Sequence, residues 1–68
     1  MSAYKIISVV GTSSKSWEDA TQAAVSAASK SLRDLRVAQV REMDVTMDKK
    51  GKINSYRAKV DLSFKYEV

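Results

Sequence analysis

The sequence predicts a single α+β domain in which a strand, a helix and two further strands follow one another. Three observations predict it. A short β-branched run occupies residues 3–10, an alanine-rich stripe recurs at helical spacing from residue 17 to about residue 35, and two segments with strand-like alternation flank a glycine turn at residues 48–51. A chain of 68 residues is the size of one domain, so we assign residues 1–68 to it.

The composition excludes most devices that stabilise a small domain. Apolar burial contributes about 100 kcal/mol to folding by area scaling, and ordering the chain costs about 100 kcal/mol, so the two terms cancel. The chain has no cysteine and no histidine, which rules out disulfides, thiolate zinc sites and Ser-His or Cys-His nucleophiles. Association between copies is the remaining source of stability, so we expect a homo-oligomer.

The first half of the chain predicts one strand and one helix. Residues 3–10 favour a strand and residues 11–14 a loop. Ser16 is the expected N-cap, with Asp19 three residues later as in a capping box. The helix is predicted from residue 17 to about residue 35, some five turns. Its apolar stripe is Trp17, Ala20, Ala24, Ala27, Ala28, Leu32 and Leu35. Three basic residues suit its negative end: Lys30, Arg33 and Arg36.

The second half predicts a β-hairpin with an irregularity. In the strand predicted at residues 36–47, the apolar residues change parity, which requires an extra residue, so we predict a bulge near Arg41 and Glu42. Residues 48–51 form the connection, with Gly51 available for positive φ. Residues 52–68 form the last strand, and its apolar face is Tyr56, Ala58, Val60, Leu62, Phe64 and Tyr66.

This order of elements predicts how the sheet is arranged. If the helix packs on one face, the first two strands run in the same direction and the last strand pairs between them, antiparallel to both. The result is a three-stranded antiparallel sheet curled around one helix. One helix leaves apolar sheet surface and two edges uncovered, and such surfaces are normally hidden. Assembly is again expected.

Two features near the helix start have structural interpretations. Gly11 to Ser16 superficially resembles a phosphate-binding loop, but the glycine directly before Lys15 is missing, so we interpret it as a turn with a serine cap. We interpret Trp17 as a packing residue rather than a ligand-stacking one. No motif marks a pair of acid and base residues, so we predict that the protein is not an enzyme.

The charged residues leave alternatives open. Three carboxylates are candidate calcium ligands or, as we favour for a single chain, solvated charges: Glu42, Asp44 and Asp48. Three cations suit nucleic acid or, as we favour, salt bridges to Glu42 or Asp44 of a neighbouring subunit: Arg57, Lys59 and Lys65. The net charge of +4 permits an anionic partner without requiring one. No apolar run reaches the about 18 residues of a membrane span and no signal-peptide pattern is present, so we expect a soluble, cytoplasmic protein.

The whole chain resembles the dodecins, small flavin-binding proteins. Five segments carry the resemblance: Tyr4-Lys5, Val10 to Ser13, Leu32 to Leu35, Val37 to Glu42, and Tyr56-Arg57 with Val60 and Phe64. The resemblance implies the strand–helix–strand–strand fold, assembled from trimers into a hollow homododecamer, with riboflavin or FMN as the family's ligand at pockets between subunits. The positions that match the family's flavin site are Val37, Gln39 and Arg57.

Two of these positions depart from the family's pattern. Val37 stands where flavin-binding dodecins have the tryptophan that stacks on the flavin, and Arg57 stands where they have a glutamine. The loss of two stacking contacts of about 1–3 kcal/mol each weakens the binding of flavin roughly 30- to 10,000-fold. We therefore expect a non-enzymatic shell that sequesters a small ligand, with flavin bound weakly. The alternative is a shell that binds calcium or another metal ion, or is purely structural; a basic nucleic-acid binder is a less favoured alternative. The segment Arg36 to Ala38 is similar to the calcium-binding branch of the family.

Overall fold

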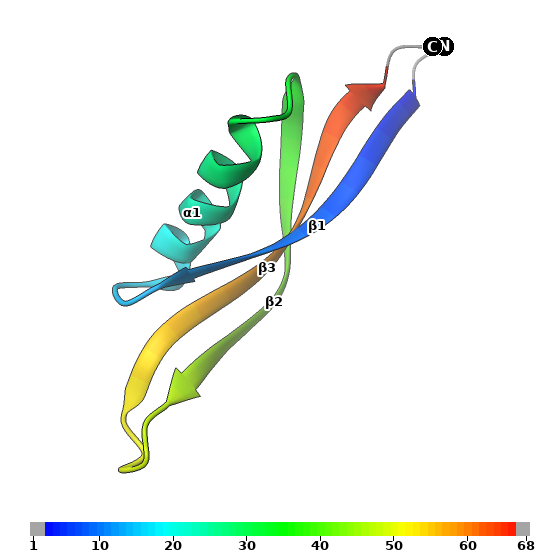
Figure 1. The fold of residues 1–68 in the computed structure, drawn as a ribbon. Helices are drawn as coiled ribbons and strands as arrows, with labels where there is room; N and C mark the ends of the chain where they lie inside the picture. The colour runs from blue at the N-terminus through cyan, green and yellow to red at the C-terminus, as the bar shows by residue number, and fades with distance from the viewer. Residues whose placement is uncertain (1–2, 67–68) are drawn as a thin grey trace.

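A computed structural model describes residues 3–66, which form four elements in the predicted order. These are β1 (Ala3–Ser13), α1 (Trp17–Ser29), β2 (Leu35–Met47) and β3 (Ile53–Tyr66). The strands form one twisted sheet in the order β1-β3-β2, with β3 antiparallel to both neighbours. Figure 1 shows α1 against one face of this sheet, while the hairpin end of β2 and β3 extends beyond the helix. The predicted fold class and the central position of the last strand are confirmed.

The predicted loop at residues 11–14 is wrong for its first three residues. β1 continues to Ser13, because Gly11 pairs with Ala58, Thr12 with Arg57 and Ser13 with Tyr56 of the long strand β3. Gly11 is buried and lies directly under α1. The absence of a side chain there lets the helix backbone approach the sheet closely.

The helix begins as predicted and ends earlier. The Ser16 hydroxyl accepts a hydrogen bond of 3.0 Å from the Asp19 backbone N–H, which confirms the N-cap. The Asp19 carboxylate accepts from the Ser13 hydroxyl at 2.7 Å, so it stabilises the preceding turn. At the other end the backbone N–H groups of Ser31 and Leu32 both donate to the Ala28 carbonyl.

The helix stops at Ser29, with Lys30 as its C-cap, and the prediction of five turns is wrong. Asp34 adopts a φ of 59°, which redirects the chain into β2. Arg33 and Arg36 consequently lie beyond the helix. Leu32 and Leu35 still pack against the core, so their helical spacing reflected burial rather than helix.

The hairpin follows the prediction closely. Val40 pairs with Val60 and Glu42 with Lys59, so Arg41 is the extra residue of a bulge at the predicted place. Gly51 has a φ of 82° in the turn. The last strand ends within the described residues at Tyr66; Glu67 and Val68 of the predicted strand lie outside them.

The core is small and leaves β2 uncovered. It consists of Ala20, Ala24 and Ala28 from α1 and Ala58, Val60 and Leu62 from β3. The helix contacts β1 and β3 far more than β2. On the helix side of β2, Met43 is 60% exposed and Met47 is 65% exposed. This chain therefore presents an apolar strand face that it does not bury by itself.

Candidate functional site

The face of the sheet opposite the helix carries most of the candidate residues. Alternation along the strands places Arg57 opposite Asp44, Lys59 opposite Glu42 and Asp61 opposite Gln39. The neighbouring strand β1 contributes Val10 and Ser8, opposite Lys59 and Asp61. We call this surface, formed by residues 8, 10, 39, 41, 42, 44, 57, 59 and 61, the charged face.

Asp44 and Arg57 form the tightest ion pair of the charged face. The Arg57 Nε donates to Asp44 Oδ1 at 2.7 Å, and a terminal guanidinium nitrogen donates to Oδ2 at 2.9 Å. The hydrogen bond from the Arg57 guanidinium lowers the pKa of the Asp44 carboxyl, and the same bond raises the pKa of Arg57. Both side chains remain about half exposed, so solvent screens the pair strongly.

Two weaker pairs extend the row of charges. Lys59 Nζ lies 3.6 Å from Glu42 Oε1, and Arg41 Nε lies 3.8 Å from Asp61 Oδ2. The Ser8 hydroxyl also donates to Asp61 Oδ1 at 2.6 Å. The chain itself thus supplies the partners of Arg57 and Lys59 that the sequence analysis expected from a neighbouring subunit.

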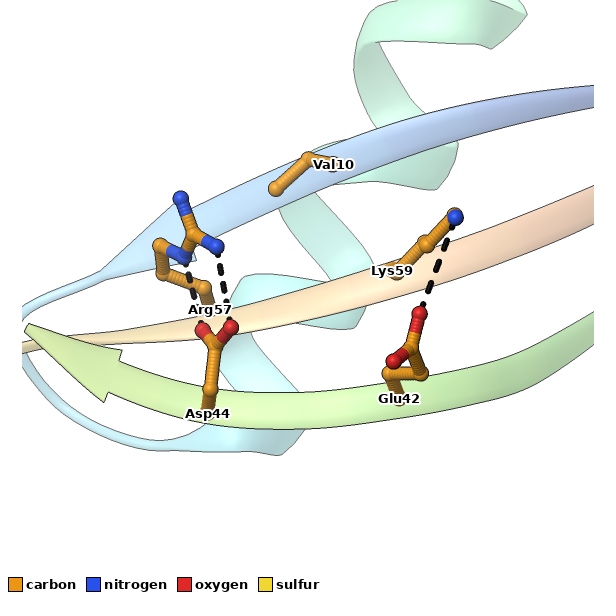
Figure 2. Close-up of a pocket in the computed structure, with 5 residues that line it drawn as sticks. All are labelled: Val10, Glu42, Asp44, Arg57 and Lys59. Atoms are coloured by element: carbon orange, nitrogen blue, oxygen red, sulfur yellow. Dashed lines mark hydrogen bonds and ion pairs between the residues drawn. The ribbon is translucent and has the colours of Figure 1, made fainter.

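A hollow of about 360 Å³ lies over two of these ion pairs, Asp44–Arg57 and Glu42–Lys59. Val10 completes its lining. Figure 2 shows both ion pairs bridging β2 and β3 across its floor, with Val10 at one side. The hollow therefore contains two carboxylates and two cations whose formal charges cancel. It is mixed in sign and polar, unlike the apolar pockets that enclose flat aromatic ligands.

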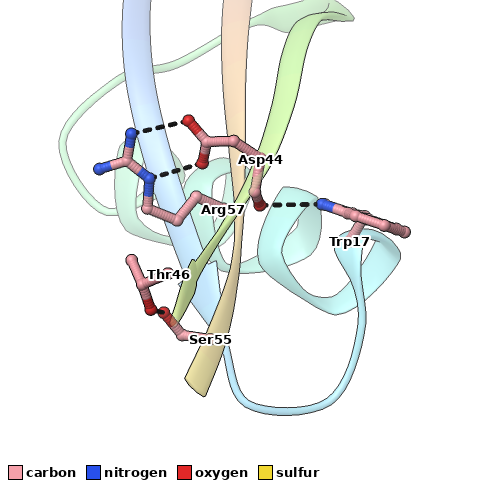
Figure 3. A network of polar contacts seen from close by, with 5 residues as sticks. All are labelled: Trp17, Asp44, Thr46, Ser55 and Arg57. Carbon is pink, nitrogen blue, oxygen red and sulfur yellow. Dashed lines mark hydrogen bonds and ion pairs between the residues drawn. The ribbon is translucent and has the colours of Figure 1, made fainter. Parts of the chain in front are cut away.

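Trp17 connects the helix to the strand that carries Asp44. Its ring packs edge-on against Tyr56, with centroids 5.1 Å apart and planes at 78°. Its indole Nε1 donates to the Asp44 backbone carbonyl at 3.1 Å. Figure 3 shows the indole meeting the Asp44 backbone on one side while the Asp44 carboxylate meets Arg57 on the other. The structure therefore confirms the packing role predicted for Trp17. The hydrogen bond from its indole to the Asp44 carbonyl was not predicted.

The positions that match the family's flavin site do not meet within one chain. Val37 lies opposite Ser63, whereas Arg57 lies opposite Asp44, six positions away along β3. At about 3.3 Å per residue this separation is about 20 Å. Val37 is 59% exposed and offers no aromatic ring, and Gln39 lies between the two, opposite Asp61.

The three carboxylates named as calcium candidates also separate into two places. Glu42 and Asp44 share the charged face, two positions apart on β2. Asp48 lies in the hairpin turn, where its Oδ1 accepts from the backbone N–H groups of Lys50 and Lys52 at 2.8 and 2.9 Å. Within residues 3–66 no three acidic side chains gather as a metal cage.

Comparison with known proteins identifies the family. The dodecin family model matches residues 3–67. The chain belongs to the dodecin family. The calcium dodecin of Mycobacterium tuberculosis is 51% identical over 65 residues, covering 96% of this chain and 90% of that protein. The resemblance derived from the sequence is therefore confirmed.

Solved structures agree with the fold of this dodecin. The crystal structure of the tt0972 protein from Thermus thermophilus superposes with a TM-score of 0.91 at 34% identity and covers 100% of this chain and 98% of that one. The crystal structure of a calcium-chelating antigen, the M. tuberculosis calcium dodecin described with a novel calcium-binding site, superposes with a TM-score of 0.84 at 48% identity, covering 96% and 91%.

Membership in the dodecin family supports the prediction that this protein is not an enzyme, since dodecins are small ligand-binding proteins. Within residues 3–66, no helix is both long enough and apolar enough to cross a membrane.

Proposed function

We propose that this dodecin is a non-enzymatic calcium-binding protein that works as a homododecamer built from trimers. The observation that carries the proposal is the identity of 51% to a relative named calcium dodecin, over nearly the full chain. This was the alternative of the sequence analysis, and it is now favoured over a flavin-binding shell.

The exposed apolar side of β2 supports the oligomer. Val40, Met43 and Met47 are 41%, 60% and 65% exposed on the side of the sheet that bears the helix. β2 is also an edge strand, so its outer backbone groups have no partner in the sheet. A second copy covering this strand removes both liabilities, and native mass spectrometry tests the subunit count directly. A monomer of 7.5 kDa at micromolar concentration would contradict the proposal.

Glu42 and Asp44 are the calcium ligands that we propose within this chain. They lie two positions apart on one strand face, and their present partners are exposed side chains that a cation can displace. Calcium takes six to eight oxygen ligands, so two carboxylates do not complete a site, and the remaining ligands come from water or from another copy. Asp48 is left out because its Oδ1 already accepts hydrogen bonds from two backbone N–H groups of the turn.

Isothermal titration with calcium and, separately, with magnesium tests this assignment. We expect heat from calcium at lower concentrations than from magnesium, because calcium tolerates irregular oxygen sites. Glu42→Gln and Asp44→Asn should each weaken calcium binding at least about tenfold. Glu18→Gln, which removes an exposed carboxylate of the first helical turn, is the matched control and should leave binding unchanged. Equal calcium affinity in all three variants would refute the assignment.

Flavin binding is predicted to be weak in this dodecin. Val37 has no ring to stack, and Arg57 is held by Asp44 through two hydrogen bonds. Fluorescence titration with riboflavin and FMN should show no saturation at submicromolar concentration. Val37→Trp restores an aromatic ring and should strengthen binding at least about fivefold, the equivalent of one stacking contact of about 1 kcal/mol.

The structure also argues against the nucleic-acid alternative. Arg57 and Lys59 are each paired with a carboxylate of β2 and do not form an open basic patch. A mobility-shift assay at low salt should therefore show no complex with DNA or RNA.

A further inference from the structure

Two of the three methionines of the chain, Met43 and Met47, lie exposed on the helix side of β2. The residue opposite Met43 is Ala58, which is too small to cover a thioether. The residue opposite Met47 is Ile53, which is itself 53% exposed. Directly opposed side chains lie on the same side of a sheet, and this end of the hairpin extends past α1 (Figure 1). Both thioethers therefore face solvent in the isolated chain.

We infer that Met43 and Met47 are oxidation sites that control assembly. A peroxide converts their thioethers to sulfoxides in the free subunit, and a subunit modified in this way no longer joins the shell. The inference rests on the proposed homododecamer, because it takes the burial of β2 by a second copy as its starting point. It adds a modification and a class of reactant, a peroxide, that assembly does not require.

The reaction transfers one oxygen atom and two electrons. A lone pair of the methionine sulfur attacks one oxygen of hydrogen peroxide, and the O–O bond breaks. The departing hydroxide takes the proton that remains on the transferred oxygen and becomes water. The sulfur is oxidised, the peroxide is reduced, and no bond of the chain is cleaved. A flexible apolar side chain thereby becomes polar.

Alternation along β2 places the new polar group on the side that assembly would bury. The residues of β2 on the charged face beside these methionines are polar, whereas those on the helix side are apolar: Met43, Val45 and Met47. A sulfoxide oxygen is a hydrogen-bond acceptor, and an acceptor that is buried without a donor opposes association. Oxidation therefore replaces a favourable contact by an unfavourable one at two positions of each subunit.

Assembly and oxidation exclude one another because both require the same two side chains. A second copy that covers β2 shields Met43 and Met47 from peroxide, whereas a free subunit exposes them by 60% and 65%. Each oxidised subunit is lost from the pool that can assemble, so by mass action peroxide draws further subunits out of the shell. Only reduction of the sulfoxides returns such a subunit to the pool.

Native mass spectrometry after peroxide treatment tests this inference. The protein is dissociated in urea, treated with hydrogen peroxide, freed of peroxide with catalase and diluted out of urea, beside an untreated sample. The untreated protein should recover the shell. In the treated protein, we expect the fraction of subunits found in shells to fall at least about tenfold, the factor that corresponds to the loss of one buried methionine contact.

Two double variants at the same positions identify the sulfur atoms as the cause. Met43→Leu combined with Met47→Leu is the matched control, because leucine keeps the apolar volume and has no sulfur to oxidise. This variant retains Met1, so oxidation of that residue affects it as it affects the parent, and after peroxide it should still recover the shell. Met43→Gln combined with Met47→Gln places polar groups on the same side without peroxide or urea, and its subunits should remain unassembled.

The results separate the oxidation sites from the proposed assembly. A peroxide-treated parent that recovers the shell, or a shell formed by Met43→Gln with Met47→Gln, overturns the inference and leaves the homododecamer standing. Equal loss of the shell in treated Met43→Leu with Met47→Leu also overturns it, because the damage then lies elsewhere in the chain. A parent protein that is monomeric before any treatment overturns both the inference and the proposed assembly.

Discussion

Replacing Gly11 by alanine should separate the helix from the sheet. A Cβ at this position would lie 1.9 Å from the Ala20 carbonyl oxygen and 2.9 Å from the Ala24 nitrogen, both backbone atoms of α1. No rotamer change can relieve contacts with backbone, so the helix must retreat by about 1.5 Å to reach an ordinary contact of 3.4 Å. A gap of about 0.5–1 Å already loses a quarter to a half of a dispersion contact.

The retreat exposes the centre of a small core. Ala20 and Ala24 are at most 1% exposed against Val60 and Leu62, so the whole helix–sheet contact loosens together. We expect a loss of about 3 kcal/mol in the free energy of unfolding, the upper end for overpacking. For a domain of this size, that loss lowers the unfolding midpoint by about 12–24 °C.

Thermal unfolding followed by circular dichroism measures this loss, at one protein concentration because the proposed association between copies would also stabilise the fold. Gly51→Ala is the matched control. A Cβ at residue 51 meets nothing within 4 Å. Because the φ of this residue is +82°, alanine there costs only the strain energy of a left-handed backbone, about 1 kcal/mol. If Gly11→Ala unfolds at the same temperature as Gly51→Ala, the close approach of helix and sheet is not what makes glycine necessary.

Three further predictions concern the cap, the tryptophan and the ion pair. Ser16→Ala removes the hydroxyl that accepts from the Asp19 backbone and should cost about 1 kcal/mol in urea unfolding; no change would show that another acceptor replaces it. Trp17→Phe keeps an aromatic ring but loses the hydrogen bond to the Asp44 carbonyl, so it should cost about 1 kcal/mol, and an unchanged midpoint would contradict that bond. Because Arg57 lowers the pKa of Asp44, the stability that the pair contributes is present above the unfolded pKa of about 3.9 and is lost as pH falls through the lower folded value. Asp44→Asn should therefore be less stable than the parent at pH 7, by a difference in unfolding free energy that shrinks as pH falls below about 3.9; a difference that stays constant as the solution is acidified would rule out the titration of Asp44 as its source.

The ion pairs of the charged face were within reach of sequence reasoning. Glu42 and Lys59 lie equally far from the Lys50–Gly51 bond, and so do Asp44 and Arg57, so an antiparallel register about that bond places them opposite one another. When the charges are taken strand by strand, no partner within the chain is evident, and for that reason a neighbouring subunit was expected to supply one. Counting outward from the Lys50–Gly51 bond would have placed them within the chain.

The contact between Trp17 and Asp44 had no such signal. The two residues are 27 positions apart and belong to elements that touch little elsewhere. Only the packing of α1 on the sheet brings the indole to this one carbonyl. The same packing decides that β2 is the strand left uncovered, and this is the surface that we propose for assembly.

The sequence itself determined four features: the order of the elements, the bulge at Arg41, the hairpin turn and the buried face of β3. Each of them depends on a local period or on a single conformational requirement. Where β1 and α1 end was decided only by the tertiary structure. β1 continues past Gly11 because β3 is long enough to pair with it, and the helix stops at Ser29 although its apolar spacing continues to Leu35. In both cases the boundary depends on contacts between residues distant in the chain, and a local pattern contains no record of them.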